Sequence, residues 1–233
     1  MAQARAIPTV ALPGEVAMPL VGLGSWQLRG RRAYDAVSFA LEVGYRHVDT
    51  ATVYGNEAEV GRALRGSGLP RQDVFLTTKL PPGSAGRERE TLAASLRALG
   101  TDYVDLWLVH WPPGDRARPQ TWRELLAIRD QGLARAVGVS NYSTSQLDEL
   151  IDATGQAPAV NQIPWSPPRH DLRRLAAPPA RRSPRGLQPA QGHPPRRPGA
   201  DRDRGQPRGD ARTGRPALAS RARDPGHPQV GLP

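Results

Sequence analysis

Four ionisable side chains of four different types stand at or just after the ends of short apolar runs. Asp49 closes one run, Tyr54 follows it by five residues, and Lys79 and His110 close two later runs. This set suits the protonation of an oxygen that gains negative charge, as a carbonyl oxygen does when a hydride attacks its carbon. Because an ammonium favours a neighbouring phenolate, we expect Lys79 to lower the pKa of Tyr54 from its usual value of about 10. Asp49 would then hold Lys79, and His110 would orient the carbonyl.

Each of these residues also has a purely structural interpretation when it is taken alone. Lys79 at a strand end could be a solvated charge, and His110 could be a packed or capping histidine. Tyr54 could anchor a loop, and Asp49 could cap a helix or a turn. Their joint placement at the ends of predicted strands favours the functional interpretation.

The chain around these positions alternates between β and α patterns. A small hairpin is predicted over residues 9–18, with Pro13-Gly14 at its turn. Further strands are predicted at 20–24, 46–49, 74–79, 103–109, 134–139 and 159–163, and helices at 32–43, 57–64, 87–99, 122–130 and 143–153. Strict alternation of near-continuous apolar strands with helices indicates a parallel sheet covered by helices.

Two architectures fit this alternation, a doubly wound sheet and an eight-stranded (β/α)8 TIM barrel. No G-x-G-x-x-G pattern follows the first strand, which weakens the dinucleotide-binding doubly wound alternative. Polar residues at the carboxyl end of nearly every strand favour the barrel, whose sites are built there. A complete barrel takes roughly 250 residues. Only six βα units are recognisable, so we predict an incomplete α/β barrel.

The composition changes abruptly after Trp165. Residues 1–166 hold 17 basic and 17 acidic residues, whereas residues 167–233 hold 15 arginines against five aspartates and so carry the whole net charge of +10. That tail also has 14 of the 25 prolines and no aromatic residue, so we expect it to be disordered. A basic arm that binds nucleic acid is an alternative, but the tail lacks aromatic residues that could stack on bases.

Other classes of protein are disfavoured. The chain has no cysteine, no H-x-x-H pair and no carboxylate cluster, so we expect no metal site. The first residues lack the apolar run of a signal peptide, and no apolar segment reaches 18 residues. We therefore expect a soluble, cytoplasmic protein with no membrane partner.

Five motifs follow one another along the chain: V-D-T-A-x-x-Y-G-N-E at 48–57, T-T-K-L at 77–80, D-L-W-L-V-H-W-P at 105–112, G-V-S-N-Y at 138–142 and V-N-Q-I at 160–163. In this order they resemble the aldo/keto reductase superfamily, and most of all its bacterial 2,5-diketogluconate and methylglyoxal reductases. The resemblance covers residues 7–166. It implies a (β/α)8 barrel that binds NADPH without a Rossmann motif, works as a monomer, and reduces aldehydes or ketones to alcohols.

The resemblance also assigns roles to residues of this chain. Asp49, Tyr54, Lys79 and His110 match the family's catalytic tetrad, with Tyr54 as proton donor and Asp49 also beside the cofactor. The other matching positions are Ser140, Asn141 and Gln162, which would hold the nicotinamide carboxamide, Gly24, Ser25 and Trp26 in the first-strand loop near cofactor and substrate, and Trp111, which with Trp26 would form apolar walls. Without the family context, Ser140 and Asn141 could instead cap the helix that follows.

The family's later segments, which carry a nicotinamide-stacking tyrosine and the groups that grip the adenosine 2′-phosphate, are not found after Pro167. We hypothesise a shift of the reading frame near residues 168–174, because codons can be chosen for residues 182–193 that, read without their first base, give V-V-L-E-A-Y-S-P-L-K-G. Residues 213–233 can likewise give T-P-A-Q-V-V-L-R-W and P-V-I-P-K-S-G-Y. A catalytically inactive frameshift product is therefore the alternative function, with weak NADPH binding and a tendency to aggregate.

Overall fold

The computed structural model describes residues 7–164. The expected disorder of residues 167–233 and the expected domain boundary near residue 166 lie outside the described residues. The described part begins with the predicted hairpin, in which β1 (Thr9–Leu12) pairs antiparallel with β2 (Val16–Pro19). Gly14 sits at its turn with φ 81°, a conformation that glycine adopts without steric cost.

Six strands then form one parallel sheet in which every strand lies beside its predecessor. They are β3 (Leu23–Gly24), β4 (His47–Asp49), β5 (Phe75–Leu80), β6 (Val104–Val109), β7 (Ala134–Ser140) and β8 (Asn161–Gln162), hydrogen-bonded in the order β3-β4-β5-β6-β7-β8. A doubly wound sheet would reverse its strand order at a switch point, and this one does not. The expected architecture, an incomplete α/β barrel, is confirmed.

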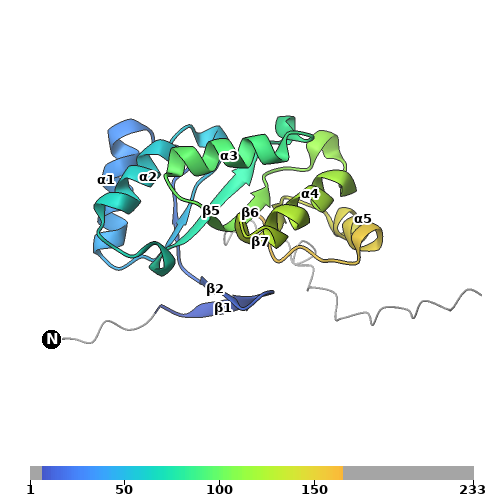
Figure 1. Ribbon diagram of the computed structural model, residues 1–233, viewed down its shortest axis with the longest axis horizontal. Coiled ribbons are helices and arrows are strands. Elements are labelled where there is room, and N and C mark those ends of the chain that lie inside the picture. The colour runs from blue at the N-terminus through green and yellow to red at the C-terminus, as the bar shows by residue number, and fades with distance from the viewer. Residues whose placement is uncertain (1–6, 165–233) are drawn as a thin grey trace, which may run out of the picture. The chain divides into compact units, whose positions relative to one another are not determined.

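The helices follow the strands one by one and lie along one face of the sheet, as Figure 1 shows. They are α1 (Gly30–Glu42), α2 (Glu57–Gly66), α3 (Glu88–Leu99), α4 (Pro119–Asp130) and α5 (Thr144–Thr154), with short 3-10 helices η1 (Thr52–Tyr54), η2 (Arg71–Asp73), η3 (Pro82–Ser84) and η4 (Pro113–Asp115) in the loops. Helix α4 begins three residues before the predicted start because Pro119 suits the first helical position, where no backbone N–H is needed. The last strand is shorter than the predicted 159–163.

The two faces of the sheet bury different sets of residues. Leu76, Trp107 and Val137 point toward the helices and belong to the main core. Phe75, Leu106, Leu108 and Ala136 occupy the opposite, inner face, where Leu12 and Val16 of the hairpin pack against them. Since side chains alternate along a strand, Lys79, His110 and Ser140 lie on this inner face too, at the carboxyl ends of their strands. The inner face is thus apolar near the hairpin and polar at the other end.

At the amino ends of the strands, a buried carboxylate ties three elements together. Asp105 is 1% exposed and accepts hydrogen bonds from Arg71 at 2.8 Å, Arg135 at 2.9 Å and the Leu76 backbone N–H at 3.0 Å. Removing one partner from such a buried network is destabilising by about 3–5 kcal/mol. This cluster stabilises the sheet at the amino ends of its strands, away from the residues predicted to be functional.

Candidate active site

Lys79 and Asp49 form a buried ion pair at the carboxyl ends of β5 and β4. Lys79 is 1% exposed, and its ammonium group donates to Asp49 Oδ1 and, at 2.9 Å, to the carbonyl oxygen of Thr50. Burial lowers the pKa of Lys79, while the negative charge of Asp49 acts in the opposite direction. The expectation that Asp49 holds Lys79 agrees with this geometry.

Tyr54 is the last residue of the 3-10 helix η1, which places its ring next to the Lys79–Asp49 pair. Gly55 follows in the left-handed conformation with φ 63° and turns the chain into α2. The Lys79 ammonium nitrogen lies 5.2 Å from the centre of the Tyr54 ring, and the Tyr54 and His110 rings meet edge to face with centroids 5.5 Å apart. The four residues singled out from the sequence are therefore brought together.

The pKa of Tyr54 does not move in the direction expected from the sequence. Burial and the negative charge of Asp49 raise the pKa of Tyr54 to about 12. The physical reason is that the charge of Lys79 is already paired with Asp49, so that the pair offers the phenol little net positive charge. Tyr54 consequently keeps its proton at neutral pH.

His110 is neutral at pH 7. Burial and the positive charge of Lys79 lower the pKa of His110 to about 4, against the opposing charge of Asp49. Its Nδ1 atom is buried and has no hydrogen-bond partner within residues 7–164. A neutral imidazole carries one proton, and a buried N–H without an acceptor is costly. The proton is therefore better placed on Nε2.

Ser140, Asn141 and Gln162 lie together where β7 and β8 end. Ser140 donates to the Gln162 carbonyl at 3.0 Å, and Asn141 Nδ2 donates to Ser140 Oγ at 2.9 Å and to the His110 carbonyl at 3.2 Å. Gln162 Nε2 donates to the second carboxylate oxygen of Asp49 at 2.8 Å. The helix that follows is capped by Ser143, which forms a capping box with Gln146. Ser140 and Asn141 are thus not its caps.

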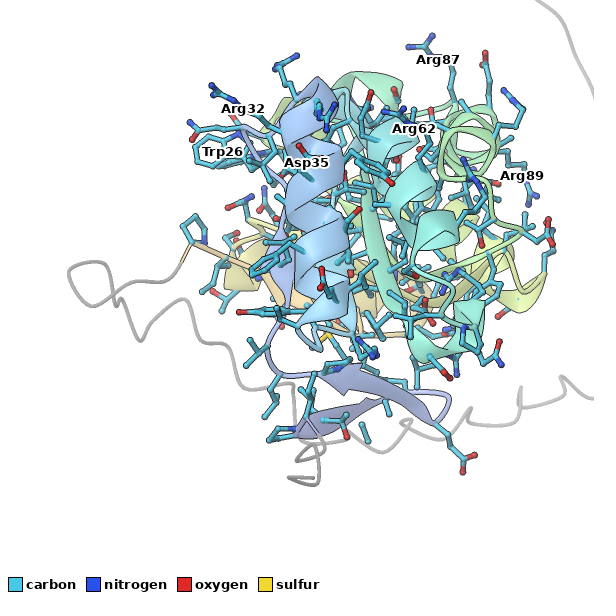
Figure 2. All side chains as sticks on the ribbon, turned by 90° about the vertical axis from the view of Figure 1, so that its left-hand side faces the viewer. Trp26, Arg32, Asp35, Arg62, Arg87 and Arg89 are labelled. Carbon is cyan, nitrogen blue, oxygen red and sulfur yellow. The ribbon has the colours of Figure 1, made fainter. Side chains whose placement is uncertain are left out.

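A hollow of about 810 Å³ opens over these groups. Of the residues singled out from the sequence, Trp26, Tyr54, His110, Trp111, Ser140, Asn141 and Gln162 line it, together with Gln27, Arg29, Val53, Ile163 and Pro164. Trp26 is 67% and Trp111 51% exposed, so both can serve as walls for a ligand. Figure 2 shows the Trp26 side chain at the outside of the molecule.

The remaining predicted residues lie behind or beside the hollow. Lys79 and Asp49 are beneath it, and neither Gly24 nor Ser25 is among its lining residues. The Ser25 side chain is fully buried, and its hydroxyl has no partner within the described part of the chain. A Cβ at Gly24 would meet no atom within 4 Å, so this position does not depend on glycine for space.

Three buried residues near Tyr54 were given no role from the sequence, although all three stand in the motif quoted at 48–57: Thr50, Asn56 and Glu57. Thr50 Oγ1 donates to Asn56 Oδ1 at 2.7 Å. Glu57 accepts from Thr78 at 2.6 Å and from Ser95 at 3.2 Å. Burial raises the pKa of Glu57, and these two hydrogen bonds oppose that rise. A polar residue that is predicted to lie at a helix start gives no sequence signal that it points inward.

A parallel barrel arc with ionisable groups at the carboxyl ends of its strands is the arrangement in which TIM-barrel proteins carry their sites. The comparisons with known proteins specify the class further, since residues 20–178 match the model of the aldo/keto reductase family. The chain therefore belongs to this family. In the described residues no group of three or more His, Cys, Asp or Glu could hold a metal ion. No helix of that same part is long and apolar enough to span a membrane.

Individual relatives agree with this assignment. An aldo-keto reductase of Mycolicibacterium smegmatis is 46% identical over 168 residues, which are 71% of this chain and 59% of that protein. A crystal structure of an aldo/keto reductase from Brucella melitensis is 45% identical with a TM-score of 0.65, covering 68% of this chain and 63% of that one. A Bombyx mori aldo-keto reductase in complex with NADP is 33% identical with a TM-score of 0.63, and the match covers 69% of this chain and 59% of that one. The chain spans about three fifths of the length of the curated relatives it matches.

Proposed function

We propose that this chain carries the proton-donating half of an NADPH-dependent reductase of aldehydes and ketones, with Tyr54 as the proton donor. The observation that carries the proposal is the placement of Tyr54 and His110 in one hollow with their ring centroids 5.5 Å apart and the Lys79–Asp49 pair beneath them. Family membership supports the reaction class, and a relative's structure with NADP supports the cofactor.

When bound, NADPH supplies the hydride that becomes attached to the carbonyl carbon. The carbonyl oxygen then gains negative charge and needs a proton, which Tyr54 holds at neutral pH because its pKa is raised to about 12. A phenol of this pKa is still a stronger acid than the alcohol that forms. The Lys79 ammonium lies 5.2 Å from the ring centre, where its positive charge opposes the unfavourable effect of Asp49 on the phenolate that remains.

His110 orients the carbonyl in this proposal. Its pKa is lowered to about 4, so at neutral pH it is a neutral imidazole while Tyr54 is protonated. With its proton on Nε2, it donates a hydrogen bond to the carbonyl oxygen from a position beside Tyr54. Donors placed where charge develops lower the barrier without reorganisation during the reaction.

The residues at the ends of β7 and β8 fit a carboxamide such as that of nicotinamide. Asn141 Nδ2 donates two hydrogen bonds within the chain and Gln162 Nε2 donates one, whereas neither Asn141 Oδ1 nor Gln162 Oε1 accepts a hydrogen bond from residues 7–164. A carboxamide NH2 has two N–H groups to donate, and two free acceptors on the lining of one hollow match it. We propose that these residues and Ser140 would hold that end of NADPH, with Asp49, Gly24 and Ser25 beside it.

A catalytically inactive product of a frameshift is the second candidate, because codons can be chosen for residues 182–193 that give a family segment in another reading frame. Two experiments separate the candidates. Carbonyl-dependent oxidation of NADPH, followed at 340 nm with a panel of aldehydes and ketones, is expected if the first holds. The coding DNA around codons 165–175 tests the second candidate. The frameshift hypothesis is rejected if no single-base change there restores the family segments.

A further inference from the structure

Trp26 and Gln27 form one wall of the hollow, and the segment that carries them has few stabilising contacts of its own. The segment between β3 and α1 closes a turn through one hydrogen bond of 3.1 Å, from the Leu28 N–H to the Ser25 carbonyl. Gln27 has φ 68°, a left-handed conformation that costs a residue other than glycine free energy. The Trp26 side chain is 67% exposed and so contributes little packing. Another group must therefore fix this segment.

The side chain of Asn56 supplies that support. Its Nδ2 atom donates to the Ser25 carbonyl at 2.9 Å and to the Leu28 carbonyl at 2.8 Å, and these two carbonyls bracket the turn. Asn56 is fully buried, and its Oδ1 accepts from Thr50 Oγ1 at 2.7 Å. Both N–H groups of the amide and its oxygen are thus in use.

Asn56 does not act as a helix N-cap, because its side chain makes these contacts instead. It stands at the N-cap position of α2, where asparagine ordinarily accepts a hydrogen bond from the first turn and stabilises the helix by about 1 kcal/mol. No such bond forms here. The side chain points back into the protein instead, and it reaches a segment 28 to 31 residues earlier in the chain.

Thr50 connects Asn56 to the Lys79–Asp49 ion pair. The Thr50 carbonyl accepts the 2.9 Å hydrogen bond from Lys79, and the Thr50 N–H donates to the Thr77 carbonyl at 2.9 Å. We propose that Asn56 is a positioning residue that sets the place of the Trp26–Gln27 wall relative to Lys79 and Tyr54. Only its consequence for substrate binding rests on the proposed function.

The test uses the whole chain labelled with 5-fluorotryptophan, whose five tryptophans give separate fluorine resonances. Trp26→Phe assigns the Trp26 resonance. Asn56→Asp keeps the size of the side chain but replaces two donors by a carboxylate that faces two carbonyl oxygens. We expect it to shift or broaden the Trp26 resonance, while those of the fully buried Trp107 and Trp122 keep their positions.

Asp105→Asn is the matched control, because it weakens a buried polar network at the opposite end of the sheet. It should lower the melting temperature and leave the Trp26 resonance unchanged. Thr50→Val removes only the hydrogen bond to Asn56 Oδ1, and it serves if Asn56→Asp does not fold. It should move the Trp26 resonance in the same direction by a smaller amount.

The proposal is overturned if the Trp26 resonance stays in place in the folded Asn56 variant, or in Thr50→Val when the first does not fold. It is equally overturned if Asp105→Asn moves that resonance as much. None of these readings requires turnover, so a chain that reduces no carbonyl would defeat the proposed function and leave this inference standing. In a chain that does turn over, Asn56→Asp is expected to raise KM more than it lowers kcat.

Discussion

Gln162 Nε2 donates a 2.8 Å hydrogen bond to Asp49 Oδ2, although the two residues are 113 positions apart and belong to strands separated by three others. Four strand spacings in a flat sheet would amount to about 19 Å. Direct contact between these side chains therefore requires the sheet to curve strongly, as a barrel does. The contact also joins the last described strand to the ion pair on which the proposed chemistry depends.

Gln162→Glu should destabilise the chain, because it places a second carboxylate beside Asp49. We expect the free energy of unfolding to fall by roughly 1–3 kcal/mol at pH 7, because Asp49 loses a hydrogen-bond donor and gains a like charge beside it. The loss should shrink as the pH falls toward 4 and the new carboxyl group takes up a proton. Urea unfolding at both pH values measures it, with Gln162→Met as the uncharged control. Equal losses for the two variants at pH 7 would contradict a role for charge.

Asp49→Asn should be among the most destabilising single changes at the site. It leaves the Lys79 ammonium, 1% exposed, without its counter-charge, which costs about 3–5 kcal/mol when one partner of a buried pair is removed. Urea unfolding followed by circular dichroism gives the loss. Lys79→Met in the same chain should recover part of it, since no unpaired charge then remains. A double variant less stable than Asp49→Asn alone would argue against the pair.

Stability should also depend on pH through His110. Its pKa is lowered to about 4 in the folded chain, whereas an unfolded histidine titrates near its ordinary value of about 6.5. The unfolded state thus binds more protons, so this contribution is complete above pH 6.5 and is lost as the pH falls toward 4. Its size is roughly 2 kcal/mol after allowance for partial exposure.

His110→Gln should flatten that segment of the stability curve, as measured by urea midpoints between pH 4 and 7. Other groups titrate over the same interval, so the difference between the two proteins is the relevant quantity. If the two curves run parallel, His110 is not the group responsible.

Weak binding of NADPH is a further expectation. The family segments that grip the adenosine 2′-phosphate are not found in residues 167–233, and phosphate contacts supply much of a dinucleotide's affinity. Titration of the purified chain with NADPH, followed by tryptophan fluorescence, should give a dissociation constant well above the micromolar range. A micromolar constant would show that the affinity has another source.

The sequence was most informative where a single repeat decides the outcome. Strand and helix alternation predicted the barrel arc, and the two-residue repeat along each strand places Lys79, His110 and Ser140 on the same face. It failed where several charges interact. Lys79 was expected to lower the pKa of Tyr54, but the pairing of Lys79 with Asp49 depends on distances that no local pattern contains.

For a similar reason, the sequence did not predict that the Asn56 side chain points into the protein. An asparagine that opens a helix is normally a cap, and only the approach of the Ser25–Leu28 segment gives its amide other partners. Gln162 likewise could be assigned to a carboxamide by resemblance, while its contact with Asp49 follows from the curvature of the whole sheet.

Tyr54→Phe tests the central claim most directly, because it removes one hydroxyl group and keeps the ring that meets His110. The measurement is the rate of carbonyl-dependent NADPH oxidation at 340 nm, at NADPH concentrations high enough to offset weak binding, for both chains matched by circular dichroism and melting temperature. A proton donor of this kind contributes about 10²–10⁴-fold, so a loss of that size in Tyr54→Phe is the expected result. A rate in the variant equal to that of a measurably active unmodified chain would contradict the assignment of Tyr54 as proton donor.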